Sequence, residues 1–196
     1  MCIRDRDENA APRVTNAAVY RLFPDFDDDH LEARFMYRAD DVHWNDEERA
    51  AIDSFRNEFK PSWIPTEGKY SDWHYMVPSK LNDRDYPKFK GNVIVLMNAK
   101  CFSATDIFLA GLKGMTNVTL LGEASGGGSA RSVTAELSNG IQVRIASMVS
   151  FQTNGELFDG NGVEPDRFIA PSPDSFLESG TDNVLQAALD LLQVEE

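Results

Sequence analysis

Ser103 is the side chain whose type and position best suit chemistry, because it lies where a buried strand is predicted to pass into a helix. The first N–H groups of a helix lack acceptors within the helix, and the helix dipole is positive at that end. Such donors stabilise a developing oxyanion, so a hydroxyl at this junction can act as a nucleophile. The spacing from Ser103 to Asp106 also fits a simple helix cap, and this alternative stays open.

A glycine run, Gly126, Gly127 and Gly128, follows the next predicted strand. It lacks the Lys-Ser/Thr ending of a P-loop and does not have the glycine spacing of a dinucleotide-binding turn. We therefore interpret it as a flexible turn, or as backbone that lies close to a bound substrate strand, rather than as a phosphate site.

The histidines and cysteines do not predict a metal centre. His30, His43 and His74 form no pair with metal-ligand spacing, and two cysteines cannot complete a zinc site. His74 lies between two aromatic residues and is expected to be packed in the interior rather than to act as a base. We expect neither a metal nor a cofactor.

Several elements must position these residues. A capping-box pattern at Asn45 and Glu48 predicts a helix that runs to about Phe59. Further along, apolar runs, helical spacing and the turn signal Asn-Gly predict the remaining elements: a strand buried on both faces at 92–98, a helix at 103–113, a second buried strand at 118–122, a hairpin of 133–137 with 141–145, and a strand at 148–153. This order predicts an α/β fold with a mixed sheet and flanking helices.

A final amphipathic helix is predicted near the end of the chain. Thr181 is expected to cap it, and the apolar residues of one stripe are expected to face inward: Leu185, Ala188, Leu189 and Leu192.

Composition excludes several classes of function. The net charge is −13 and the pI is near 4.6, which argues against a nucleic-acid surface. No apolar run approaches the roughly 20 residues that a membrane-spanning helix needs, so no membrane span is expected.

The chain divides into three segments by composition. Residues 1–6 resemble translated sequencing-adapter read-through of the kind found in metagenomic reading frames, so we expect a truncated gene. Residues 7–90 are rich in charge, hold all three tryptophans and are predicted to be an irregular segment that packs on the core. Residues 91–196 are predicted to hold the main core.

Three blocks resemble, in order, the C-terminal part of the S41 serine peptidases, the tail-specific or C-terminal processing protease family. They are Val93–Asn98 running into Phe102–Asp106, then Leu121–Gly128, and then Asp159–Asp166. The resemblance covers roughly residues 90–168. It implies a fold of the ClpP/crotonase type and cleavage of a peptide or protein substrate through an acyl-enzyme on Ser103. Asp106 stands where the family usually has Glu.

The resemblance also implies how Ser103 would be activated. Members with a Ser–Lys dyad carry the lysine at the position of Gly128, so this chain is more similar to the tricorn-like branch without lysine, which uses a serine, a histidine and an acid. The acid of that branch maps to Asp159, and Glu156 is the alternative. Asp159 could also be an ordinary turn aspartate before Gly160, with no catalytic role. The N–H of Ala104 would be one oxyanion donor.

The family's histidine and its Asp-Leu-Arg-Gly-Asn-x-Gly-Gly segment, which gives the second oxyanion donor, are not found here. We therefore expect the base to lie upstream and the chain alone to be inactive. The glycine loop and the hairpin strands are expected to bind substrate backbone as an added strand. Relatives are usually exported, which implies an extracytoplasmic location.

Two alternative functions remain. One is a non-catalytic binding protein on the same scaffold, similar to the retinoid-binding relatives, in which Ser103 only caps a helix. The other is an acyl-CoA enzyme of the crotonase type, against which the scarcity of basic residues counts. The sequence does not define an oligomeric state.

Overall fold

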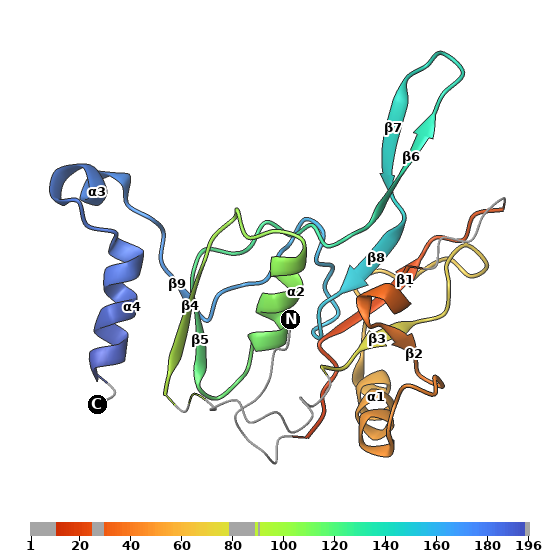
Figure 1. Cartoon of the computed structure of the whole chain (residues 1–196), viewed down its shortest axis with the longest axis horizontal. Coiled ribbons are helices and arrows are strands. Elements are labelled where there is room, and N and C mark those ends of the chain that lie inside the picture. Colours follow the sequence, from red (N-terminus) through yellow and green to blue (C-terminus); the bar gives the residue numbers. More distant parts are fainter. Residues whose placement is uncertain (1–10, 25–29, 79–88, 90, 195–196) are drawn as a thin grey trace.

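The structure, a computed structural model, describes residues 11–24, 30–78, 89 and 91–194. Within these ranges the chain forms two sheets and a separate hairpin, with helices packed at their sides (Figure 1). The predicted α/β class with flanking helices is confirmed, and in the described residues its parallel and antiparallel strands lie in separate sheets. Residues 1–6 and the predicted adapter read-through lie outside the described residues.

The first sheet is antiparallel and has the strand order β2–β3–β1–β8. Its strands are β1 (Asn16–Tyr20), β2 (Tyr37–Arg38), β3 (His74–Met76) and β8 (Met148–Phe151). Ala17 lies opposite Tyr75 on one side and Phe151 on the other, so β1 is a central strand. Strands that lie far apart in the sequence therefore share one sheet.

Helix α1 (Asp46–Glu58) covers one face of this sheet. The predicted capping box is confirmed: Asn45 Oδ1 accepts from the Glu48 N–H at 2.9 Å, and Glu48 Oε2 accepts from the Asn45 N–H at 3.1 Å. Ile52 packs with Val14, Trp44 and other apolar residues in a buried cluster. The described residues between 11 and 78 thus form β1, β2, β3 and α1 and hold a buried cluster made of their own side chains.

The second sheet is parallel and has the order β4–β5–β9. It contains β4 (Val93–Met97), β5 (Val118–Gly122) and β9 (Arg167–Phe168), and helix α2 (Ala104–Leu112) connects β4 to β5. Met97, Leu109 and Leu120 form the core between the helix and the sheet. The predicted strands and helix are confirmed.

The prediction that β4 is buried on both faces is wrong. Leu96 is 41% exposed, because the face of the sheet away from α2 is only loosely covered by α4 (Asn183–Val194). On α4 itself Ala188 is buried, whereas the three predicted inward leucines are exposed. The cap is Asp182, not Thr181, since Asp182 Oδ1 accepts from the N–H groups of Val184 and Leu185.

The remaining elements are short. The predicted hairpin is present as β6 (Ser132–Glu136) and β7 (Gln142–Ala146), with Gly140 at φ +79° in its turn. A 3₁₀ turn, η1, spans Glu32–Arg34, and α3 spans Pro173–Ser179 before α4. No helix within the described residues is long and apolar enough to cross a membrane.

Candidate active site

Ser103 lies directly before α2 with an unusual backbone conformation. Its φ is +60° and its ψ is −118°, and it is one of two non-glycine residues with positive φ in the described part of the chain. Such a conformation is costly for a residue with a Cβ, and strained residues of this kind cluster at functional sites. The side chain is exposed, so its hydroxyl is open to an incoming group.

The helix-cap interpretation of Ser103 is wrong. Its hydroxyl makes no capping hydrogen bond, and the Asp106 N–H instead donates to the Ser103 carbonyl oxygen at 2.9 Å. Within the described residues no side chain hydrogen-bonds the Ser103 hydroxyl. The Ser103 side chain therefore does not cap the N-terminus of α2.

Ala104 is the first residue of α2 and is exposed. Its N–H belongs to the first turn and has no acceptor within the helix. No backbone acceptor for it is found among the described residues. The donor expected next to the nucleophile is thus free and lies at the positive end of the helix dipole.

Asp106 holds the glycine loop against α2. It is completely buried, and its two oxygens accept from the Ser125 hydroxyl at 2.5 Å, the Gly127 N–H at 3.2 Å and the Gly128 N–H at 3.1 Å. Ser125 Oγ in turn accepts from the Val163 N–H at 2.7 Å. The carboxylate three residues after Ser103 is therefore engaged by the scaffold.

This clamp is not predicted from the sequence. An acid three residues after a serine fits a helix cap, and the same spacing also brings an acid onto the buried side of the first helical turn. The available signal was the glycine run, whose backbone donors need acceptors if the loop is packed.

The glycine loop is packed tightly rather than open. A Cβ on Gly127 would lie 2.3 Å from the Phe158 carbonyl oxygen, and one on Gly126 would lie 2.5 Å from the Ala99 carbonyl oxygen. The Gly126 N–H donates to the Cys101 carbonyl at 2.7 Å, and the other two glycine N–H groups donate to Asp106. All three donors are used internally, so a substrate strand at the predicted glycine subsite has only carbonyl groups to pair with.

Asp159 lies beside the far end of this loop and is half-buried. Its Oδ1 accepts from the Ala130 N–H at 3.3 Å, and the following Gly160 N–H donates to the Gly127 carbonyl at 3.0 Å. Burial raises the pKa of the Asp159 carboxyl, and the nearby Asp106 charge adds to this, although the Ala130 N–H acts in the opposite direction. No hydrogen bond joins Asp159 to Ser103 in the described part of the chain.

The alternative acid, Glu156, is exposed in the turn after β8. Its N–H donates to Asn154 Oδ1 at 3.0 Å, and its carbonyl accepts from Gln152. Nothing links its side chain to the glycine loop in the described residues. The structure therefore brings Asp159, and not Glu156, next to the residues around Ser103.

Neither His74 nor His43 is hydrogen-bonded to Ser103 in the described residues. His74 is buried, as predicted, and its Nδ1 is 2.8 Å from the Asp72 carbonyl oxygen. His43 stacks on Tyr37, and its Nδ1 is 2.6 Å from Asp41 Oδ1. Within the described residues, no group of three or more His, Cys, Asp or Glu side chains could hold a metal ion.

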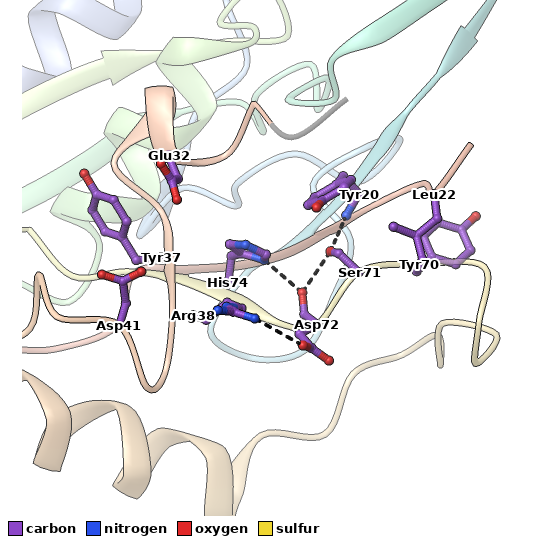
Figure 2. A pocket seen from close by; sticks show the side chains of 10 residues that line it. All are labelled: Tyr20, Leu22, Glu32, Tyr37, Arg38, Asp41, Tyr70, Ser71, Asp72 and His74. Atoms are coloured by element: carbon purple, nitrogen blue, oxygen red, sulfur yellow. Dashed lines mark hydrogen bonds and ion pairs between the residues drawn. The ribbon is translucent and has the colours of Figure 1, made fainter. Parts of the chain in front are cut away.

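A separate pocket of about 480 Å³ opens on the first sheet. Figure 2 shows that Asp72 and Ser71 lie near its middle, with aromatic and acidic side chains around them. None of the predicted site residues lines it; its walls are Tyr20, Leu22, Glu32, Tyr37, Arg38, Asp41, Tyr70, Ser71, Asp72 and His74.

Fold and site together define a class of protein: an α/β scaffold with an exposed serine at a strained strand-to-helix junction. The model of peptidase family S41 matches residues 38–169, which is more than half of the chain. The chain belongs to peptidase family S41, a family of serine-type peptidases. No curated protein matches it.

Parts of the chain are also similar to solved structures. A candidate peptidase from Parabacteroides merdae is 28% identical with a TM-score of 0.53, and the match covers 63% of this chain and 38% of that one. A candidate S41 protease from Bacteroides fragilis is 17% identical with a TM-score of 0.38, covering 54% and 28%. The tricorn protease is 22% identical with a TM-score of 0.40, covering 77% and 14%. The chain thus spans well under half the length of the relatives that it matches.

Proposed function

We propose that the protein containing this chain is a serine endopeptidase in which Ser103 attacks a peptide carbonyl and forms an acyl-enzyme. The observation that carries the proposal is the strained, exposed Ser103 directly before the free N–H of Ala104. In the mechanism the Ser103 oxygen bonds to the carbonyl carbon while its proton passes to a base, and the Ala104 N–H stabilises the oxyanion. The tetrahedral intermediate then collapses: the C–N bond breaks, the amine leaves with the proton held by the base, and the acyl group stays on Ser103 as an ester. Water, deprotonated by the same base, hydrolyses this ester, and the proton returns to the Ser103 oxygen.

The base in this proposal is a histidine, which the resemblance to the lysine-free members of the family places upstream of this chain. Asp159 supports it electrostatically, as an acid orients the histidine of a catalytic triad. Its position beside the glycine loop supports this role, and Asp106 is unavailable because it already accepts three hydrogen bonds. The substrates in this proposal are peptides or proteins. We also propose an extracytoplasmic location, because members of the family are usually exported.

Fluorophosphonate labelling of the full-length protein tests the proposal. The reagent phosphonylates an activated serine, and we expect the label on the peptide that contains Ser103. Ser103→Ala should abolish labelling, whereas Thr105→Ala, at an exposed hydroxyl on the same helical turn, should leave it unchanged. A folded full-length protein that does not label at Ser103 contradicts the proposal.

A second candidate function, a non-catalytic binding protein on the same scaffold, has one observation in its favour. The pocket on the first sheet, about 480 Å³, lies within the size range of small-molecule sites. Its walls are mostly polar, whereas such sites are mostly apolar. Labelling at Ser103 separates the two functions, because a serine without a base to activate it does not react with the reagent.

A further inference from the structure

The β6–β7 hairpin, with its turn, has one apolar face and one polar face. In its register Val133 lies opposite Ile145, Ala135 opposite Val143, and Leu137 beside Ile141 at the turn. Successive side chains of a strand point to opposite faces, so these six share one face. The other face holds the remaining pairs: Ser132 with Ala146, Thr134 with Arg144, and Glu136 with Gln142.

Most of this apolar face is exposed in the described structure, with Val133 and Val143 partly buried. Ile145 is 53% exposed, Ile141 is 55% exposed and Leu137 is 47% exposed. Figure 1 shows the hairpin projecting away from both sheets, and β6 and β7 pair only with each other among the described strands. An isolated two-stranded hairpin is marginal in water, and a contiguous exposed apolar surface marks an interaction site.

The hairpin begins at the candidate active site. Gly128, which Asp106 holds, and Ala130, whose N–H binds Asp159, are the residues that lead into β6. At the other end, the Ser147 N–H donates to the Arg131 carbonyl at 2.8 Å before β8 enters the first sheet. The hairpin is therefore joined to the candidate site by the short segment 128–131, two of whose N–H groups are bound by Asp106 and Asp159.

The size of the face decides what kind of partner it fits. Five residues of strand extend about 17 Å, and two strands are about 5 Å apart, so the face measures a few hundred Å² at most. A stable complex buries about 800 Å² on each partner. The face is therefore too small to hold a second copy of the chain by itself, and it suits a transient partner of one extended strand.

We propose that the apolar face and free edges of the β6–β7 hairpin bind an extended, unfolded segment of the protein substrate with apolar side chains at alternate positions. This inference rests on the proposed peptidase function. The backbone N–H and C=O groups along the unpaired outer edge of β6 or β7 bind the main chain of the segment. Val143 and Ile145 contact its apolar side chains, so the hairpin selects unfolded substrates outside the cleavage site.

Peptide binding to the chain with Ser103→Ala, measured by fluorescence anisotropy, tests the proposal without cleavage. The probe is a soluble labelled peptide in which valine alternates with threonine, and the control peptide has the same composition with the valines grouped together. We expect the alternating peptide to bind at least about tenfold more tightly than the grouped one. Equal affinities contradict the proposal.

Paired variants test the two faces separately. Val143→Thr with Ile145→Thr keeps β-branched residues but removes apolar contact, and should weaken binding by about tenfold. Arg144→Gln lies between them on the polar face, and should change binding by less than about twofold. Neither should change the melting temperature by much, because among the described strands β6 and β7 pair only with each other. Equal loss in both variants overturns the proposal.

Two further measurements test whether something other than a substrate segment covers the apolar face. A dimer in sedimentation that the double variant abolishes, without peptide binding, would make the face an interface between copies. Hydrogen-exchange protection of the β6–β7 amides in the full-length protein without peptide would show that the remainder of the chain covers the face. Either result overturns the proposal, while Ser103 labelling still tests the peptidase function independently.

Discussion

The buried carboxylate of Asp106 explains how one residue fixes the geometry around a neighbouring nucleophile. It accepts three hydrogen bonds from the glycine loop while standing one helical turn after Ser103. Hydrogen bonds to a charged acceptor are stronger than those between neutral groups. Because Asp106 is buried, leaving any of these polar groups without a partner would lower the stability of the fold. Asp106 therefore binds the helix that carries Ser103 to the loop that precedes the hairpin.

Substituting Asp106→Asn should destabilise the chain by about 1–3 kcal/mol. An amide replaces one acceptor oxygen with a donor, which then faces another donor from Ser125 or the glycine backbone. Denaturant unfolding of the chain measures the loss. Asp174→Asn, at an exposed carboxylate of α3, is the control and should change stability by about 0.5 kcal/mol or less.

The raised pKa of Asp159 predicts how stability depends on pH. A carboxyl whose pKa is higher in the folded state than in the unfolded state favours folding when it is protonated. This contribution is complete below the ordinary value of 3.8 and disappears as the pH rises through the folded-state pKa. Above that window, ionised Asp159 makes the folded chain less stable than a neutral residue would.

The variant Asp159→Asn should therefore be more stable than the parent at pH 7, and the difference should shrink as the pH falls toward 4. The amide oxygen can still accept from the Ala130 N–H, so the loop contact is retained. Denaturant unfolding at a series of pH values measures the difference. A difference that stays constant across this range would contradict the assignment of the raised pKa to Asp159.

At the scale of the elements, the glycine loop is packed directly against the backbone of neighbouring segments, which leaves no room for side chains on its glycines. Gly127 has φ +63°, and a Cβ there would lie 2.3 Å from the Phe158 carbonyl oxygen and 2.4 Å from the Gly162 nitrogen. Neither neighbour is a flexible side chain, so the backbone of residues 158–162 would have to move.

Gly127→Ala should cost about 2–5 kcal/mol, from the left-handed conformation together with overpacking. Gly140→Ala is the matched control, because Gly140 has a similar φ of +79° but nothing within 4 Å of its Cβ position. Its cost should be only about 1–2 kcal/mol. Similar melting temperatures for the two variants would show that the loop is less tightly packed than described.

Helix α4 shows why element prediction from sequence is incomplete. The spacing of Leu185, Ala188, Leu189 and Leu192 correctly indicates an amphipathic helix, but in the described structure only Ala188 is buried. Periodicity identifies a face of a helix, and it does not say what covers that face. The capping box at Asn45 was predictable in detail because it depends on residues three apart.

At the scale of the whole molecule, the parts that could be predicted are those with local causes. The β4–α2–β5 order, the position of Ser103 and the positive φ of Gly140 follow from residues close together in the chain. The pairing of Ala17 with Phe151 does not, because such a contact is fixed by packing across the sheet. The clamp by Asp106 was missed for the same reason: its partners, Ser125, Gly127 and Gly128, come from another element.

Trapping of the acyl-enzyme is the measurement that tests the central claim most directly. The full-length protein is mixed with an activated ester, quenched in acid and analysed by peptide mass. The account predicts an acyl group on the peptide that contains Ser103, released by hydroxylamine and absent in Ser103→Ala. An acyl group on another residue, with Ser103 unmodified in an enzyme that hydrolyses the ester, would contradict it.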